Sequence, residues 1–174
     1  MLRRWALACG AILLLSGCAT GSGTDFASLA QKVGPPKAGQ SRIVVLQEKR
    51  EGLSLSICAC DVKVDDDAIG KAKAGTYVYA DRPAGRHLLI VSELLFPGDS
   101  KREIRTEAGR TYFFLVRASK RHDALMGTTI VGGLAGLAVG SIATAGIENP
   151  GPADIFPLDD AAARTTLADL QLSD

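Results

Sequence analysis

The sequence is poor in the features that identify an enzyme or a nucleic-acid-binding protein. Its 174 residues hold 20 Lys and Arg against 19 Asp and Glu, so it has no basic excess to bind a phosphate backbone. Only two histidines occur, His87 and His122, and the sequence contains no Gly-x-Ser-x-Gly, Ser-x-x-Lys or His-Glu-x-x-His motif. We therefore expect a protein that is not an enzyme, binds no nucleic acid and needs no cofactor.

Metal-binding motifs are lacking too. Cys58 and Cys60 share one face of a strand, but two thiols fall short of the four ligands of a structural zinc site. We expect two buried thiols, with a strained mutual disulfide as the alternative in an oxidising compartment. The run from Asp65 to Gly70 imitates the start of a calcium loop, but Thr76 stands where a bidentate glutamate is needed. This run predicts a turn, and we expect no metal site.

What the sequence does contain is an N-terminal export signal. Arg3 and Arg4 precede an apolar stretch from Trp5 to Leu15 that is too short to span a bilayer. The run Leu15-Ser16-Gly17-Cys18 resembles the lipobox of bacterial lipoproteins, whose cysteine is diacylated on its thiol and becomes the first residue after cleavage. We therefore predict a signal peptide over residues 1–17 and lipid attachment at Cys18.

This signal places the protein in the cell envelope, attached to a membrane through Cys18. Ala19 is not the aspartate that commonly retains lipoproteins in the inner membrane, so we expect an outer-membrane lipoprotein facing the periplasm. The periplasmic side of the inner membrane is the alternative. Cleavage at Ala19-Thr20 would instead give a soluble periplasmic protein. Without residues 1–17 the chain loses two positive charges and remains nearly neutral.

The next residues predict a tether followed by a β-domain. Small and polar residues over 18–40, with only a weakly helical patch, predict a flexible tether. Residues 41–123 alternate apolar segments with turns and show no helical pattern, which is typical of an antiparallel sandwich of about seven or eight short strands. The expected strands are Arg42–Glu48, Leu53–Val64, Thr76–Ala80, His87–Leu95, Arg102–Glu107 and Thr111–Val116, with Arg102–Glu107 at an exposed edge.

An apolar insertion interrupts this β-pattern over residues 124–150. No charged residue occurs between Ala124 and Ile147, and Gly132, Gly136 and Gly140 recur every fourth residue. On one helix these glycines would form a groove that allows close helix packing. We favour an insertion packed on the protein or folded as a hairpin over a spanning helix or a flexible loop. Residues 151–174 then predict a last strand and a C-terminal helix that complete the domain.

Several motifs of the β-domain match a known family. Val62-Lys63-Val64-Asp65-Asp66 is followed by Ile69-Gly70-Lys71, Gly75-Thr76-Tyr77 and Pro83-Ala84-Gly85-Arg86-His87. This pattern resembles domain-of-unknown-function family 2846 of bacterial lipoproteins, and the last stretch is similar to the turn of PEGA-type domains. The resemblance covers roughly residues 41 to 120 plus the tail. It implies a small β-sandwich and no established activity.

Together these features predict a non-enzymatic, lipid-anchored envelope protein whose β-domain is a binding or assembly module in the periplasm. Its expected partner is an unidentified envelope protein or glycan, and a homo-oligomer is also considered. The alternative is a membrane-active or oligomerising component that acts through the apolar segment 124–147.

Overall fold

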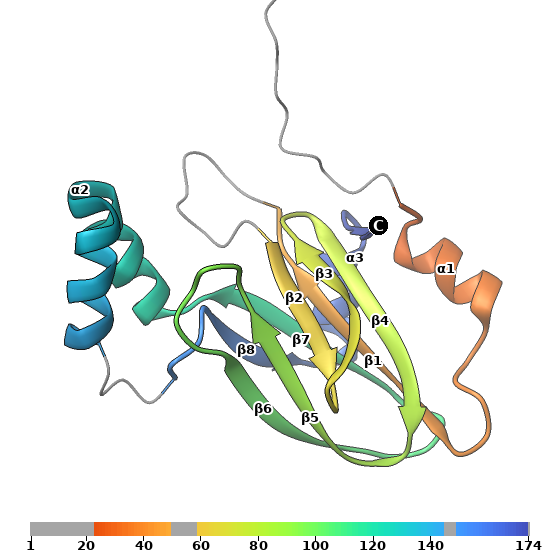
Figure 1. Ribbon diagram of the computed structural model, residues 1–174. Coiled ribbons are helices and arrows are strands. Elements are labelled where there is room, and N and C mark those ends of the chain that lie inside the picture. The colour runs from red at the N-terminus through yellow and green to blue at the C-terminus, as the bar shows by residue number, and fades with distance from the viewer. Residues whose placement is uncertain (1–22, 50–58, 145–148, 174) are drawn as a thin grey trace, which may run out of the picture.

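The computed structural model describes residues 23–49, 59–144 and 149–173, and the predicted lipid attachment site Cys18 lies outside them (Figure 1). Two β-sheets pack face to face. The strands are β1 (Gln40–Gln47), β2 (Ala59–Val64), β3 (Asp67–Lys73), β4 (Thr76–Pro83), β5 (Gly85–Ser92), β6 (Ser100–Thr106), β7 (Thr111–Ala118), β8 (Ala153–Leu158) and β9 (Gln171–Leu172). One sheet has the order β8-β7-β1-β4-β9 and the other the order β3-β2-β5-β6. The prediction of a mainly β sandwich with a helical insertion and a C-terminal helix is confirmed.

Most neighbouring strands are antiparallel, but two pairs are parallel. β7 runs parallel to β1, with Arg42 opposite Thr111, and β9 runs parallel to β4. β7 reaches β1 after the chain has passed through β5 and β6 of the second sheet, and β9 reaches β4 after the C-terminal helix. The sequence pattern also missed β3, most of whose residues are exposed and which carries no apolar run. β6 lies at a sheet edge, as expected for its charged residues.

The main hydrophobic core fills the space between the sheets. Strand β2 illustrates how this core forms, because its residues Cys60, Val62 and Val64 point inward and alternate with more exposed residues. The same core takes in Ile43, Val45, Ala72, Val78, Leu89, Val91, Ile104, Phe114, Val116, Ala153 and Ile155. Cys60 is thus part of the packed core, whereas Cys58 lies outside the described residues.

A second core covers the outer face of the five-stranded sheet. The helices α1 (Phe26–Val33) and α3 (Asp160–Leu167) contribute to it. The ring of Phe26 meets Tyr77 and Phe113 edge-on, with ring centroids 5.5 and 5.7 Å apart. Asp159 caps α3, and Leu167 and Leu170 of this tail are both buried.

Helix α1 corrects the expectation of a flexible tether over residues 18–40 for the part that the structure describes, because Phe26–Val33 is helical. Asp25 accepts a hydrogen bond from the Ser28 backbone N–H and caps the helix. At its other end the Arg42 side chain donates to the Gly34 carbonyl and forms a two-bond ion pair with Asp81. The helical pattern in these residues is weak because a helix this short is stable only when it packs on another element. Its own sequence does not show that a sheet lies beside it.

Candidate functional site: a helical hairpin and its base

The apolar insertion forms α2 (Lys120–Ala143), which is bent back on itself. Gly133 interrupts the helix with φ of 56° and ψ of −140°, a conformation that favours glycine because it lacks a Cβ. The residues before and after Gly133 form two helical arms that lie side by side at the left of Figure 1. We call this unit the hairpin. The segment therefore folds as a hairpin, which is one of the arrangements favoured from the sequence, and not as a straight spanning helix.

The two arms touch where glycine leaves room for the backbone. A Cβ at Gly136 would overlap the Thr128 carbonyl group of the first arm. A Cβ at Gly140 would lie 2.5 Å from Thr128 Oγ1 and 2.8 Å from Leu125 Cδ2, closer than van der Waals contact allows. Gly136 and Gly140 thus allow the arms to approach closely.

Gly132 does not belong to this contact, which corrects the expected row of three glycines. A Cβ at Gly132 would meet no atom within 4 Å. The reason is the break at Gly133, which places Gly132 on the first arm while Gly136 and Gly140 lie on the second. The spacing of four residues indicates a shared face only if the helix continues, and here it does not.

Hydroxyl groups in the hairpin bond to the hairpin's own backbone. Thr128 and Thr129 both donate to the Leu125 carbonyl, at 3.0 and 2.7 Å. Ser141 donates to Leu137 at 2.7 Å and Thr144 to Gly140 at 2.8 Å. The hydrogens of these four hydroxyls therefore do not need water as an acceptor.

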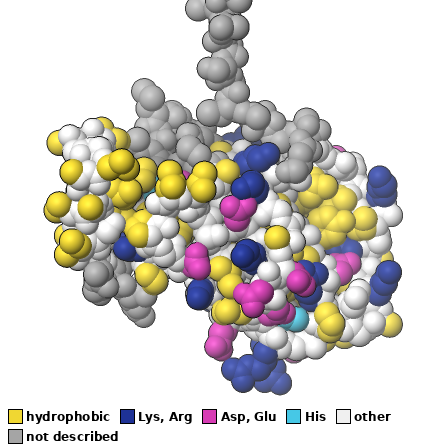
Figure 2. Space-filling model, viewed as in Figure 1, with side chains coloured by type: hydrophobic (Ala, Val, Ile, Leu, Met, Phe, Trp, Pro, Cys, Tyr) yellow, Lys and Arg dark blue, Asp and Glu magenta, His cyan; other side chains and the backbone are white. Residues whose placement is uncertain are grey.

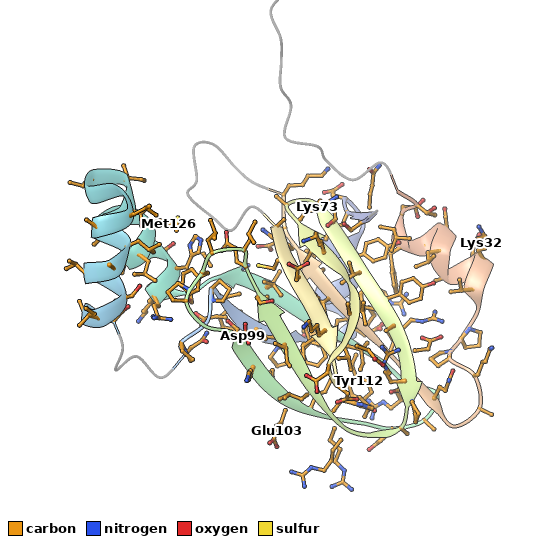
Figure 3. The ribbon with its side chains drawn as sticks, in the orientation of Figure 1. Lys32, Lys73, Asp99, Glu103, Tyr112 and Met126 are labelled. Carbon is orange, nitrogen blue, oxygen red and sulfur yellow. The ribbon has the colours of Figure 1, made fainter. Side chains whose placement is uncertain are left out.

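Apolar side chains cover the outside of the hairpin. Val131 is 90% exposed, Leu134 83% and Ile142 80%, and Ile130 and Val139 are also exposed. Figure 2 shows hydrophobic side chains over the hairpin at the left and most charged side chains over the sandwich. In Figure 3 several side chains of the hairpin point outward, away from the sheets. A large exposed apolar surface of this kind marks an interaction site.

The base of the hairpin, by contrast, is polar and tightly bonded. Arg121 is only 6% exposed, and its guanidinium donates to Thr144 Oγ1 at 3.0 Å and to the Pro97 carbonyl at 2.5 Å. It also donates to the Pro150 carbonyl and lies over the Phe96 ring, 5.4 Å from the centroid. One side chain thus joins the first arm to the end of the second arm, to the returning chain and to the β5–β6 loop.

Two neighbours of Arg121 complete this base. Ser119 accepts a hydrogen bond from the His122 backbone N–H and donates to the Gly151 carbonyl, so it caps the first arm and holds the returning chain. His122 is buried, stacks on Phe96 and has Nε2 3.3 Å from a Glu93 carboxylate oxygen. The sequence analysis missed this base, although the polar residues directly before the apolar run were a signal for it.

The other histidine, His87, has its ring held between two acceptors. Its Nδ1 lies 2.5 Å from Asp65 Oδ2 and its Nε2 lies 2.8 Å from the Pro83 carbonyl oxygen. The second Asp65 oxygen accepts from the Leu88 N–H at 2.8 Å. Burial would raise the pKa of Asp65, but the hydrogen bonds from His87 and Leu88 outweigh it and keep that pKa below its ordinary value. This group joins the β2–β3 turn to the start of β5.

We expect Asp65 to give the fold an acid-sensitive component. Because the pKa of Asp65 is lower in the folded protein, its carboxylate stabilises the fold above the unfolded-state pKa of about 3.8. That contribution is lost as the pH falls through the lowered pKa of the folded state. Urea unfolding at a series of pH values should show a steeper loss of stability below about pH 4 for the parent than for Asp65→Asn. Identical profiles would contradict this role.

Comparison with known proteins gives a family for the chain. The family model described as a protein of unknown function, DUF2846, matches residues 37–129. The match runs from just before β1 into the first arm of the hairpin, so the second arm, β8, α3 and β9 lie beyond it. No curated protein matches the chain. Because the matched residues make up more than half of the sequence, the chain belongs to the DUF2846 family.

Proposed function

We propose that this protein is a non-enzymatic lipoprotein of the cell envelope, anchored through Cys18 and facing the periplasm from the outer membrane. In this proposal the β-sandwich is a binding or assembly module that holds the hairpin in a fixed position. The supporting observation is the contrast within the hairpin, whose base is buried and bonded by Arg121 while its outer surface is apolar and exposed.

The histidines fit a binding module better than a catalyst. The His87 ring is held between the Asp65 carboxylate and the Pro83 carbonyl, and His122 is buried against Phe96. Both side chains therefore join structural elements to one another. The exposed apolar residues of the hairpin, Val131, Leu134 and Ile142 among them, are largely uncovered by the domain, which supports an external partner.

The lipid anchor is tested by metabolic labelling with a palmitate analogue in a bacterial host. We expect the parent chain to incorporate the label and Cys18→Ser to incorporate none, because the thiol is the acylated group. Cys9→Ser is the matched control, since Cys9 lies in the signal but outside the lipobox-like run. Label that persists in Cys18→Ser would refute the anchor. Fractionation of the labelled parent with inner-membrane markers would refute the outer-membrane location.

A second candidate is a membrane-active or oligomerising component that acts through the apolar segment. The exposed apolar residues of the hairpin favour this function, and α2 is, by length and composition alone, long and apolar enough to cross a membrane. Carbonate extraction of Cys18→Ala separates the two functions. Carbonate strips proteins held only at the membrane surface, so release into the soluble fraction favours the anchored binding module, and retention, which needs a segment embedded in the bilayer, favours the second candidate.

A further inference from the structure

We infer that the hairpin is a second membrane attachment, which lies in the interface of the leaflet that holds the acyl chains on Cys18. This inference rests on the proposed lipid anchor but concerns a different part of the chain. It assigns the hairpin's exposed surface to a lipid bilayer and not to a second copy of the protein. The turn at Gly133, with Val131 and Leu134 on either side, is the part that enters the lipid.

The first support is that the hairpin is apolar on all sides yet largely uncovered. A helix with apolar residues all round is normally buried in a protein core or in a membrane. Here the exposed residues lie on both arms, with Val131 before the break and Leu134 and Ile142 after it. The described part of this segment beyond Asp123, residues 124–144, carries no charged side chain that would oppose transfer to lipid.

The second support is that the hydroxyl groups of the hairpin already have hydrogen-bond acceptors. Thr128, Thr129, Ser141 and Thr144 each donate to a carbonyl of their own arm. Polar groups that already have a partner cost less to move from water into an apolar phase. A surface made to bind a polar protein or glycan would instead direct such groups outward.

The third support is the direction in which the hairpin points. In Figure 1 the turn between its arms and the start of the described chain beside α1 lie at the same, upper side of the molecule. Cys18 is only five residues before Gly23, and an extended chain of that length reaches about 17 Å. A membrane that holds the acyl chains on Cys18 would therefore pass close to the turn at Gly133.

The length of the arms fixes the mode of attachment. At 1.5 Å per residue the arms before and after Gly133 are about 20 and 15 Å long, well short of a hydrocarbon core of about 30 Å. The break at Gly133 also leaves backbone groups that a fully lipid-exposed turn could not satisfy. An interfacial position, about 5–10 Å into the boundary between headgroups and acyl chains, fits both facts.

The test is flotation of residues 18–174 carrying Cys18→Ser, with vesicles of phosphatidylethanolamine and phosphatidylglycerol in a three-to-one ratio. This protein cannot be acylated at position 18, so its binding reports on the folded domain alone. We expect it to float with the vesicles, and Leu134→Asp to lower its partition coefficient about tenfold or more. Val33→Asp, which adds the same charge at an exposed position of α1, is the matched control and should float like the parent.

Three results would overturn the inference. In the first, the parent does not float with the vesicles. In the second, the parent floats and Leu134→Asp floats equally well. In the third, the parent stays with the soluble fraction as a dimer that Leu134→Asp dissociates, which would assign the surface to a second copy. None of these results depends on acylation, so flotation and the labelling of Cys18 can fail independently. Thermal unfolding of Leu134→Asp should match the parent, because this side chain is 83% exposed.

Discussion

Replacement of Arg121 by Met is expected to lower the free energy of unfolding by about 3 kcal/mol. Met fills much of the space that the buried Arg121 side chain occupies beside Phe96 but donates no hydrogen bond, so the carbonyls of Pro97 and Pro150 lose their donor. The link to Thr144 at the end of the second arm is lost as well. Urea unfolding monitored by circular dichroism measures this loss of stability.

Arg121→Lys separates charge from geometry at this position. One ammonium group cannot copy a planar guanidinium that reaches Thr144, Pro97 and Pro150 while lying over the Phe96 ring. We therefore expect the lysine variant to stay closer in stability to Arg121→Met than to the parent. Limited proteolysis should cut both variants at the base of the hairpin before the β-sandwich is degraded. A lysine variant as stable as the parent would show that charge alone suffices.

Replacement of Gly136 by Ala is expected to destabilise the hairpin by about 1–3 kcal/mol. The new Cβ would overlap the Thr128 carbonyl, and a backbone group cannot rotate aside as a long side chain can. The arms would have to separate, which exposes more of the segment to solvent. Hydrogen exchange of the amides on both arms measures this, because exchange there should become faster while the amides of β1 stay protected.

Gly132→Ala is the matched control four residues earlier. A Cβ at Gly132 meets nothing within 4 Å, and alanine is a better helix former than glycine by about 0.5–1 kcal/mol. We expect this variant to be as stable as the parent or slightly more stable. Equal destabilisation by Gly132→Ala and Gly136→Ala would contradict this interpretation, in which Gly136 stabilises the hairpin by allowing the two arms to touch.

Much of the sandwich could be predicted because its information is local. The alternation of Val62 and Val64 with polar neighbours predicts a half-buried strand, and the apolar run at the start of β7 predicts one buried on both faces. Asp159 before an alanine-rich run is a local signal of the same kind for the C-terminal helix. In each case the residues that form the element also carry the pattern that identifies it.

The sequence by itself thus determined the strand pattern of the domain, the lack of charge in the insertion and the Leu15–Cys18 run that predicts an anchor. Only the tertiary structure decided that α1 packs on a sheet, that β1 lies parallel to β7 and that Gly136, but not Gly132, lies in the contact between the arms. Each of these depends on segments far apart in the chain, or on the single reversal at Gly133. A helix that ends one residue earlier or later places the same glycines on different surfaces, and periodicity in the sequence does not record that choice.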